Sequence, residues 1–386
     1  MTIPDHAWNE SETGADTATG RPVLYLTTRP GRHRGPPYHR RGAFSADNRT
    51  TLFEMQRRNE CALVLADVAT GELTPLLRGT SANGAPLFHG FFALHETTNW
   101  IAAVREKTAL LLIHAQTKET RVLIDNAGAG MEWGCPCWSL DGADILINRI
   151  PRDTSSVGAS APTIYERIRI RDGARERVWE DSAGFGRHTQ VCPANDDWLL
   201  IDRDRPPGFS IYGDFRASPR AWLLNLRTSE LRPLQPNNDW RFQIHTNFNA
   251  DGSRIYYHGR ACPTPETPGD TMDDTPQYVG ACDLNGTVLW EHVFPCFHYG
   301  HVCAHTQQEA IVTDGLVSRD LLCLLEYEDA GANGRPRIVV LGRHGSDWAR
   351  ALGQAAHPHP VMTPDGQRLL FAAGQGDSTR LGLLQV

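Results

Sequence analysis

The sequence contains no long apolar run and no sustained helical periodicity. No stretch is long enough to span a membrane, and no apolar core typical of a signal peptide is present. The net charge of −7 shows no basic excess of the kind that nucleic-acid-binding domains carry. There is no glycine-rich nucleotide loop and no serine in a nucleophile elbow. We therefore expect neither a membrane nor a nucleic-acid partner.

A disulfide framework is also missing from the sequence. The nine cysteines are an odd number and are scattered, mostly in strand-like runs. The pair in Cys135-Pro136-Cys137 has no second pair with which to form a zinc knot. Scattered thiols of this kind are typical of a reducing compartment. We expect buried free thiols and a cytoplasmic location.

Short strand-turn units recur along the chain. Each has an apolar or small lead-in, a turn and a short apolar strand. The aligned turn residues are 44 to 58 positions apart, at Asp47, Thr97, Asp141, Asn195, Asp251, Gln307 and Asp365. Most units are followed by a second hairpin, and two hairpins in about 50 residues are typical of a four-stranded propeller blade.

The repeat predicts an all-β protein, a seven-bladed β-propeller with four-stranded blades. It spans residues 21–386 and indicates one closed domain. We expect the opening strand, 21–28, and the final strand, 380–386, to complete one blade together and close the ring. Residues 1–20 are polar and are expected to form a separate N-terminal segment, loosely held or packed over the ring.

Histidines recur at one register of this repeat. Equivalent positions in a propeller lie at equivalent heights around the central channel. The residues six positions before the turns are Arg41, Phe91, Cys135, Thr189, His245, His301 and His359. Blades five, six and seven therefore direct histidine toward one axial region, and His188 is adjacent to the corresponding position of blade four.

A metal site is predicted just before the seventh turn. His357 and His359 are two residues apart, which places both on one face of an extended strand within reach of Gln354. Flanking prolines favour an extended backbone there. Imidazole with one carboxamide oxygen tolerates manganese, zinc, iron or nickel, and affinity alone favours zinc over manganese. The absence of a thiolate from this set disfavours a closed structural zinc site.

These motifs resemble those of the oligogalacturonate lyases, seven-bladed propeller enzymes of pectin breakdown. The resemblance covers most of the chain and is densest from 220 to 371. The family pattern Gln-x-x-His-x-His-Pro is matched from Gln354 to Pro360, and His301 stands at the matching distance before Thr313-Asp314-Gly315. The resemblance implies a manganese ion held by His301, Gln354, His357 and His359.

The resemblance also implies residues for catalysis and substrate binding. His245 matches the family's base, and Arg220, near Trp222, matches an arginine that assists catalysis. The HxQ motif of the fourth blade appears here as His188-Thr189-Gln190. The residues expected to contact substrate are His188, Gln190, Arg41 and Trp222. The chain departs from the family after the base, where Thr246-Asn247-Phe248 replaces Glu-Phe-Trp, and this departure leaves the identity of the uronate open.

The chemistry of β-elimination suits these residue types. The reaction removes the C5 proton of a 4-linked uronate, alpha to its carboxylate, and expels the C4 oxygen. A divalent cation offsets the negative charge that develops on the carboxylate. Histidine suits the base because its pKa lies near working pH, and arginine is a permanent cation that can hold a carboxylate.

The charge distribution leaves two interpretations of one segment. The stretch from Arg29 to Arg41 is densely basic and enters the first blade beside the seventh. It could attract an anionic sugar despite the overall negative charge, or it could be a solvated arginine-rich loop.

Three functions fit the sequence. The first is a cytoplasmic metal-dependent lyase that acts on short imported oligogalacturonides. The second is a lyase that acts on another uronate-containing glycan. The third is a non-catalytic propeller that binds a partner, with a structural metal or none, because this fold serves many functions.

Overall fold

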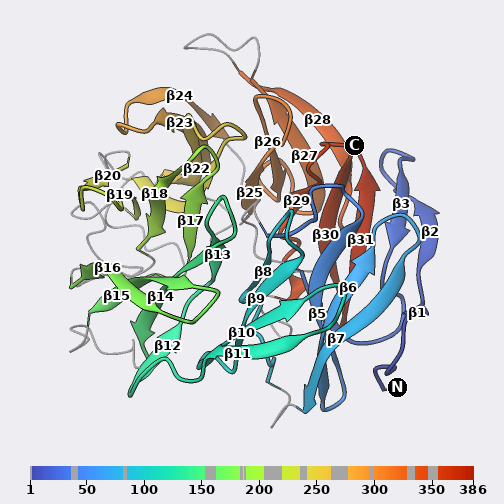
Figure 1. The fold of residues 1–386 in the computed structure, drawn as a ribbon. Coiled ribbons are helices and arrows are strands. Elements are labelled where there is room, and N and C mark those ends of the chain that lie inside the picture. Colours follow the sequence, from blue (N-terminus) through green and yellow to red (C-terminus); the bar gives the residue numbers. More distant parts are fainter. Residues whose placement is uncertain are drawn as a thin grey trace.

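The computed structural model describes residues 2–35, 42–80, 85–152, 162–182, 186, 188–203, 220–234, 241–261, 277–294, 300–327, 335–346 and 355–386. Within these ranges the strands form seven antiparallel sheets of four or five strands. The sheets stand around a ring (Figure 1), which confirms the predicted all-β, seven-bladed propeller. No helix in the described part of the chain has the length and apolar character needed to cross a membrane.

The first three blades come from the N-terminal half of the chain. Blade one contains β4 (Arg32–Arg34), β5 (Thr50–Arg57), β6 (Glu60–Asp67) and β7 (Glu72–Thr80). Blade two contains β8 (Phe92–Leu94), β9 (Trp100–Arg105), β10 (Ala109–His114) and β11 (Thr120–Ile124). Blade three contains β12 (Met131–Trp133), β13 (Cys137–Trp138), β14 (Asp144–Pro151), β15 (Thr163–Arg169) and β16 (Arg175–Asp181).

The next three blades are four-stranded. Blade four contains β17 (Thr189–Cys192), β18 (Asn195–Asp202), β19 (Ala221–Asn225) and β20 (Leu231–Pro233). Blade five contains β21 (Arg241–Phe248), β22 (Arg254–Ala261), β23 (Gln277–Asp283) and β24 (Val288–Phe294). Blade six contains β25 (His301–Ala304), β26 (Ala310–Asp314), β27 (Leu321–Glu326) and β28 (Arg337–Arg343).

The two ends of the chain share blade seven, as predicted. Its strands are β29 (Val361–Met362), β30 (Arg368–Gln375) and β31 (Ser378–Gln385), followed by β3 (Pro22–Tyr25) and β2 (Glu12–Ala15). Val23 pairs with Leu384, which joins the N-terminal strand to the C-terminal one. β1 (Trp8–Asn9) pairs with β7 in blade one. Residues 1–20 therefore contribute outer strands to blades one and seven.

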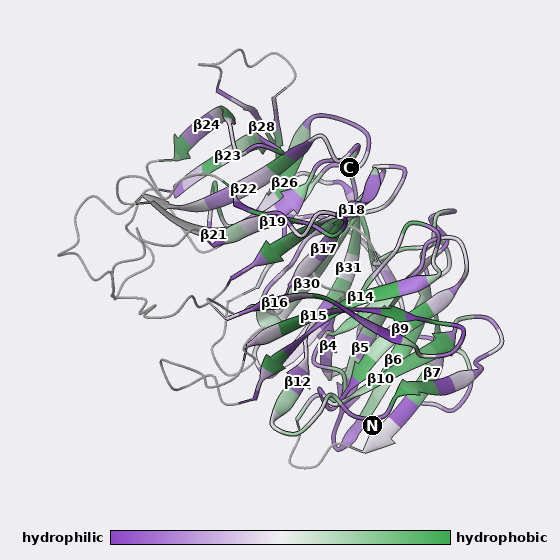
Figure 2. Ribbon diagram, turned by 60° about the vertical axis from the view of Figure 1, so that its left-hand side comes forward, coloured by the Kyte–Doolittle hydropathy of each residue, from purple (hydrophilic) through white to green (hydrophobic). Residues whose placement is uncertain are grey.

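Apolar side chains from adjacent blades form the core. One cluster joins Phe53 and Met55 of blade one to Leu370 and Leu383 of blade seven. Middle strands such as β10 are buried along most of their length, whereas outer strands such as β16 are largely exposed. Figure 2 shows the same contrast, with hydrophobic residues concentrated in β6, β9 and β10. A strand that packs on both faces needs apolar residues at successive positions, as these middle strands have.

The turns of the innermost hairpins set the register at the channel. Asp251 accepts a hydrogen bond from the backbone N–H of Ser253 (2.9 Å), and Gly252 has a φ of 73°, as an Asp-Gly turn requires. This turn places His245 opposite His258 on β22. In blade six the equivalent turn places His301 opposite Asp314. In these two blades the residue six positions before the aligned turn thus faces the residue seven positions after it.

Candidate functional site

Three of the predicted metal ligands lie together at the channel. His301 begins β25, and His357 and His359 lie just before β29. Their potential ligand atoms all lie within 4.8 Å of one another. The first strands of adjacent blades, such as β21 and β25, contact one another around the ring. Gln354, the fourth predicted ligand, lies outside the described residues.

The backbone around His359 differs from the extended strand that the sequence predicted. His359 has a φ of 44°, in the left-handed region that non-glycine residues rarely adopt. A following proline favours extended backbone for the residue before it, yet His359 departs from that preference, and its backbone N–H donates to Oδ2 of Asp314 (3.1 Å). The rings of His357 and His359 nevertheless approach each other, with centroids 5.6 Å apart.

Asp314 forms hydrogen bonds with residues of this cluster. Its Oδ2 lies 3.0 Å from Nδ1 of His301, and its Oδ1 accepts the backbone N–H of His301. A ring that donates from Nδ1 presents the lone pair of Nε2, which is how metal-binding histidines are oriented. Burial raises the pKa of the Asp314 carboxyl to about 7, although hydrogen bonds from His301 and His359 act to lower it.

The three imidazoles fit a divalent metal ion. Burial lowers the pKa of His357, and it lowers the pKa of His301 and of His359 well below the usual value. The rings are therefore neutral at neutral pH, which is the form that binds a metal. Neutral imidazole donors at this spacing suit zinc, manganese, iron or nickel.

His245 stands beside this cluster. It lies in β21 with 4% of its surface exposed, and its ring centroid is 4.7 Å from that of His301. Its Nδ1 lies 2.7 Å from Nε2 of His258. Burial lowers the pKa of His245 well below its usual value, and positive charge on His301, His258 and Arg220 would lower it further. The ring is therefore neutral at pH 7 and can accept a proton.

Arg220 is held by a carboxylate that the sequence analysis did not identify. Its Nε and Nη2 donate to the two carboxylate oxygens of Asp202, the latter over 3.0 Å. Its positive charge acts to lower the pKa of His245 and of His258. The guanidinium of Arg203 lies 4.0 Å from the centroid of the Trp222 ring.

The predicted HxQ motif of blade four contributes two different contacts. Nδ1 of His188 lies 3.5 Å from Sγ of Cys135, and a charge on His188 would lower the pKa of His301. The side-chain amide of Gln190 donates to the backbone oxygen of Thr246 (2.8 Å). His188 thus borders the histidine cluster, and Gln190 connects blade four to blade five.

The basic stretch reaches the same part of the channel. Arg41 lies outside the described residues. Arg34, in β4, donates from Nη1 to the backbone oxygen of His89 (2.7 Å). Its charge acts to lower the pKa of His357 and of His359. Blade one therefore brings a cation close to the cluster.

Sequence reasoning missed several of these residues. His258 was not among the predicted site residues, yet its Nε2 lies 2.7 Å from Nδ1 of His245. The signal that could have identified both His258 and Asp314 is their position seven residues after an aligned turn, opposite His245 and His301. Asp202 has the same signal, because it lies seven residues after the aligned turn residue Asn195, although its partner Arg220 is 18 residues further along the chain.

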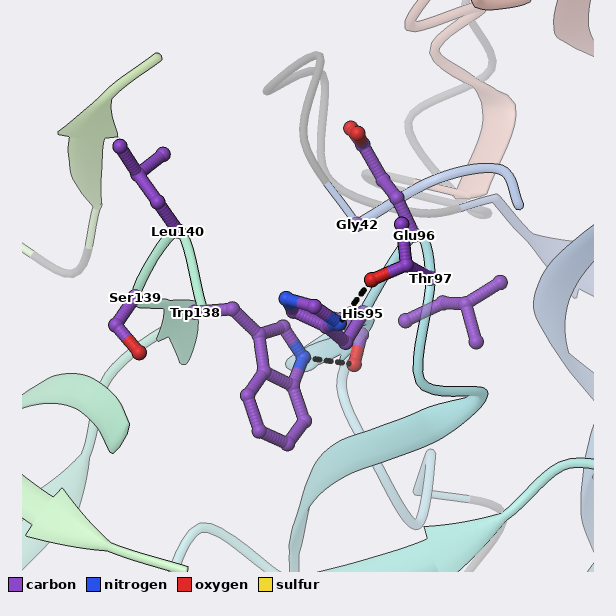
Figure 3. A pocket seen from close by; sticks show the side chains of 9 residues that line it. Gly42, His95, Glu96, Thr97, Trp138, Ser139 and Leu140 are labelled. Atoms are coloured by element: carbon purple, nitrogen blue, oxygen red, sulfur yellow. Dashed lines mark hydrogen bonds between the residues drawn. The ribbon is translucent and has the colours of Figure 1, made fainter. Parts of the chain in front are cut away.

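A small pocket elsewhere in the ring is separate from the candidate site. It has a volume of about 50 Å³ and lies at the ends of β8 and β13. Figure 3 shows the ring of His95 beside the indole of Trp138, with ring centroids 5.4 Å apart. None of the predicted site residues lines it. It is far smaller than the roughly 300–1,000 Å³ of typical ligand sites.

Among the described residues, seven cysteines are present and none of them forms a disulfide. Together, the fold and the site define a seven-bladed β-propeller with a partly buried histidine cluster at its channel.

Solved structures of oligogalacturonate lyases share this fold. One, in complex with manganese, has a TM-score of 0.77 and 17% identity, and the match covers 100% of this chain and 98% of the lyase. Another, from Vibrio parahaemolyticus, has a TM-score of 0.78 and 18% identity, with 100% and 99% covered. U3-55K is more distant, with a TM-score of 0.56, 8% identity, and 97% and 100% covered.

These likenesses confirm the resemblance to oligogalacturonate lyases at the level of the fold. No family model matches the sequence, and no curated protein matches it.

Proposed function

We propose that this protein is a metal-dependent lyase that cleaves short oligogalacturonides by β-elimination. The observation that carries this proposal is the position of His245, a buried neutral imidazole whose ring lies 4.7 Å from that of His301 in the three-histidine cluster. The full-length match in fold to oligogalacturonate lyases supports the same reaction class. A purely structural metal site would not need an additional imidazole and a guanidinium beside it.

The proposed metal ligands are His301, His357, His359 and Gln354. We favour manganese because one of the matching lyases was solved in complex with it. When bound, the ion supplies positive charge that eases the build-up of negative charge on the substrate carboxylate. The role of Asp314 is to hold His301 in the tautomer that presents Nε2 to the ion.

His245 acts as the base in this proposal. Its Nδ1 lies 2.7 Å from Nε2 of His258, and we assign the acceptance of the C5 proton to its Nε2. The C5–H electrons form the C4–C5 double bond, the C4–O bond breaks, and the departing oxygen takes up a proton. Positioned acid-base catalysis of this kind contributes on the order of 100- to 10,000-fold in rate.

Arg220 stabilises the anionic substrate in this proposal. The bidentate contact with Asp202 uses its Nε and Nη2 and fixes the guanidinium plane. In this proposal the guanidinium contacts the substrate carboxylate or the departing oxygen. We assign substrate contacts to His188, Gln190, Trp222 and Arg41, and we propose a cytoplasmic location, which implies a short, imported substrate.

A lyase acting on another uronate-containing glycan is the second candidate. The residues after the base favour it, because Thr246-Asn247-Phe248 differs from the Glu-Phe-Trp of the oligogalacturonate lyases. Thr246 and Asn247 are buried and make contacts between blades. The backbone oxygen of Thr246 accepts from Gln190, and Asn247 donates to the backbone oxygen of Val302 (3.1 Å).

The experiment is ultraviolet absorbance with digalacturonate and trigalacturonate, because elimination leaves a conjugated unsaturated uronate. Wild type, His245→Ala and a control, His292→Ala on the outer strand β24, are stripped of metal and reloaded with manganese. We expect metal-dependent absorbance in wild type and the control, and its loss in His245→Ala. Bound metal without absorbance on galacturonides would favour the second candidate. If the protein binds no metal and forms no product, both lyase proposals are contradicted.

A further inference from the structure

His245 and His258 form a buried pair across the first two strands of blade five. They are direct partners in the β21–β22 ladder, and their ring centroids are 4.9 Å apart. His258 is 0% exposed. The distance of 2.7 Å between Nδ1 of His245 and Nε2 of His258 is that of a hydrogen bond. One of the two nitrogens is therefore the donor and the other the acceptor.

The direction of this bond decides which nitrogen of His245 holds a lone pair. A neutral imidazole carries one N–H and one acceptor nitrogen. If His245 donates from Nδ1, its Nε2 is unprotonated and can remove a proton from a substrate. If His258 donates from Nε2, His245 carries its proton on Nε2 and cannot act as the base.

We propose that His258 is the positioning residue of the base: its Nε2 accepts the Nδ1–H of His245, which fixes the ring and keeps Nε2 of His245 unprotonated. This inference rests on the lyase reaction proposed above. His258 touches neither the substrate nor the metal ligands in this role, and it acts through His245 alone.

Two physical arguments favour this direction. First, the ring beside His245 on its other side is that of His301, a member of the candidate metal cluster. A cation held there attracts a lone pair of His245 and repels an N–H. Second, proton abstraction leaves His245 with both nitrogens protonated. The bond to His258 then becomes charge-assisted and stronger, so that it stabilises the transition state more than the ground state.

The opposite direction is a real competitor. In the proposed arrangement His258 carries its own proton on Nδ1, a buried atom for which the structure provides no hydrogen-bond acceptor. The reversed bond avoids an unsatisfied buried donor, which is costly. The tautomer of His245 is therefore the quantity to measure.

The first readout is the tautomer itself. The full chain is labelled with ¹⁵N-histidine and loaded with zinc, which is diamagnetic, and long-range ¹⁵N–¹H spectra are recorded. The His245 signals are identified by their loss in His245→Gln. We expect the proton of His245 on Nδ1. A proton on Nε2 in the wild-type protein would overturn the inference, and this reading needs no variant of His258.

The second readout uses two variants of His258. His258→Gln keeps an acceptor, because its carboxamide oxygen reaches the position of Nε2, whereas His258→Leu removes it. We expect kcat to fall roughly 10- to 100-fold in His258→Leu with KM within about 2-fold of wild type. We expect His258→Gln to recover most of that loss and to keep the Nδ1–H tautomer. Equal losses in both variants, or none in His258→Leu, would contradict the inference.

A matched control separates this role from a loss of structure. His305 is also buried, in the neighbouring blade, where its Nδ1 accepts the backbone N–H of Gln307 (3.1 Å). His305→Gln is expected to leave kcat and the His245 tautomer unchanged. If wild type shows no lyase activity, the proposed function fails, but the tautomer of His245 can still be measured. If activity is present but the tautomer is reversed, only the inference about His258 fails.

Discussion

Asp314 and His301 face each other across β25 and β26, and Oδ2 of the carboxylate lies 3.0 Å from Nδ1 of the imidazole. Asp314 is 0% exposed and also accepts backbone N–H groups from His301 and His359. One carboxylate thus orients residues from both segments that form the histidine cluster. The cluster is therefore preorganised by a residue that need not touch the metal.

This relationship predicts the effect of Asp314→Asn on metal binding. The carboxamide is a weaker acceptor for the Nδ1–H of His301 and can present N–H groups to the backbone donors. We expect affinity for manganese to fall roughly 10- to 100-fold, measured by calorimetric titration of metal-stripped protein. Asp365→Asn is the control, because Asp365 caps an exposed turn. Unchanged affinity in Asp314→Asn would show that Asp314 does not orient the ligands.

Asp202 is expected to be important for stability because it neutralises Arg220. The side chains of Asp202 and Arg220 are only 6% and 15% exposed. Removing one member of a buried pair leaves the other charge uncompensated, so Asp202→Ala should lower the free energy of unfolding by about 3–5 kcal/mol. The measurement is urea denaturation followed by fluorescence.

The double variant tests the cause of that loss. Asp202→Ala with Arg220→Met removes the stranded charge, and we expect it to be more stable than Asp202→Ala alone. The exposed pair of Arg227 and Asp197 is the comparison, where Asp197→Ala should cost less than about 1 kcal/mol. A double variant no more stable than Asp202→Ala would contradict the role assigned to Asp202.

The sequence predicted the fold and much of the candidate site because both follow from the repeated strand-turn unit. Seven aligned turns determine the blades, and one register across them brought His301 and His359 together correctly. That register lies on the first strands alone, so it does not include residues of the second strands, such as His258 and Asp314. Counting outward from each turn in both directions would have paired them with the histidines.

Other features depend on contacts that no local pattern specifies. The left-handed conformation of His359 depends on the backbone contact to Asp314, 45 residues away. The contact between Arg203 and Trp222 depends on how β18 ends beside β19. Pro360 favours an extended backbone for the residue before it, but His359 has a φ of 44°, so this local preference does not decide its conformation.

Ring closure should depend on Leu381. This residue in β31 is 0% exposed in the cluster shared by blades one and seven, and its backbone oxygen accepts the N–H of Leu26 (2.8 Å). We expect Leu381→Ala to lower the free energy of unfolding by about 2–5 kcal/mol through the cavity it leaves. Chemical denaturation is the measurement, with the exposed Gln385→Ala as the control. A loss no larger than that of the control would mean that this blade contributes little to closure.

His33 should make stability depend on pH. It is 0% exposed in β4, and Nδ1 lies 2.6 Å from the backbone oxygen of Thr379, to which it donates. Burial lowers the pKa of His33 to about 4, whereas the unfolded chain has a value near 6.5. As pH falls below about 6.5, the unfolded state gains a proton that the folded state does not bind, so stability is lost until about pH 4.

The variant His33→Asn isolates this contribution, because its amide N–H can still donate to Thr379 but does not titrate. Between pH 7.5 and 4.5, wild type should lose roughly 2–3 kcal/mol more stability than the variant, which follows from the shift in pKa. Urea denaturation at both pH values measures the difference. Burial also lowers the pKa of His344 to about 4. His344 is present in both proteins, so its contribution to the pH dependence is the same in each and does not affect the difference. Identical pH dependence in the two proteins would mean that His33 takes up a proton as readily in the folded state as in the unfolded chain.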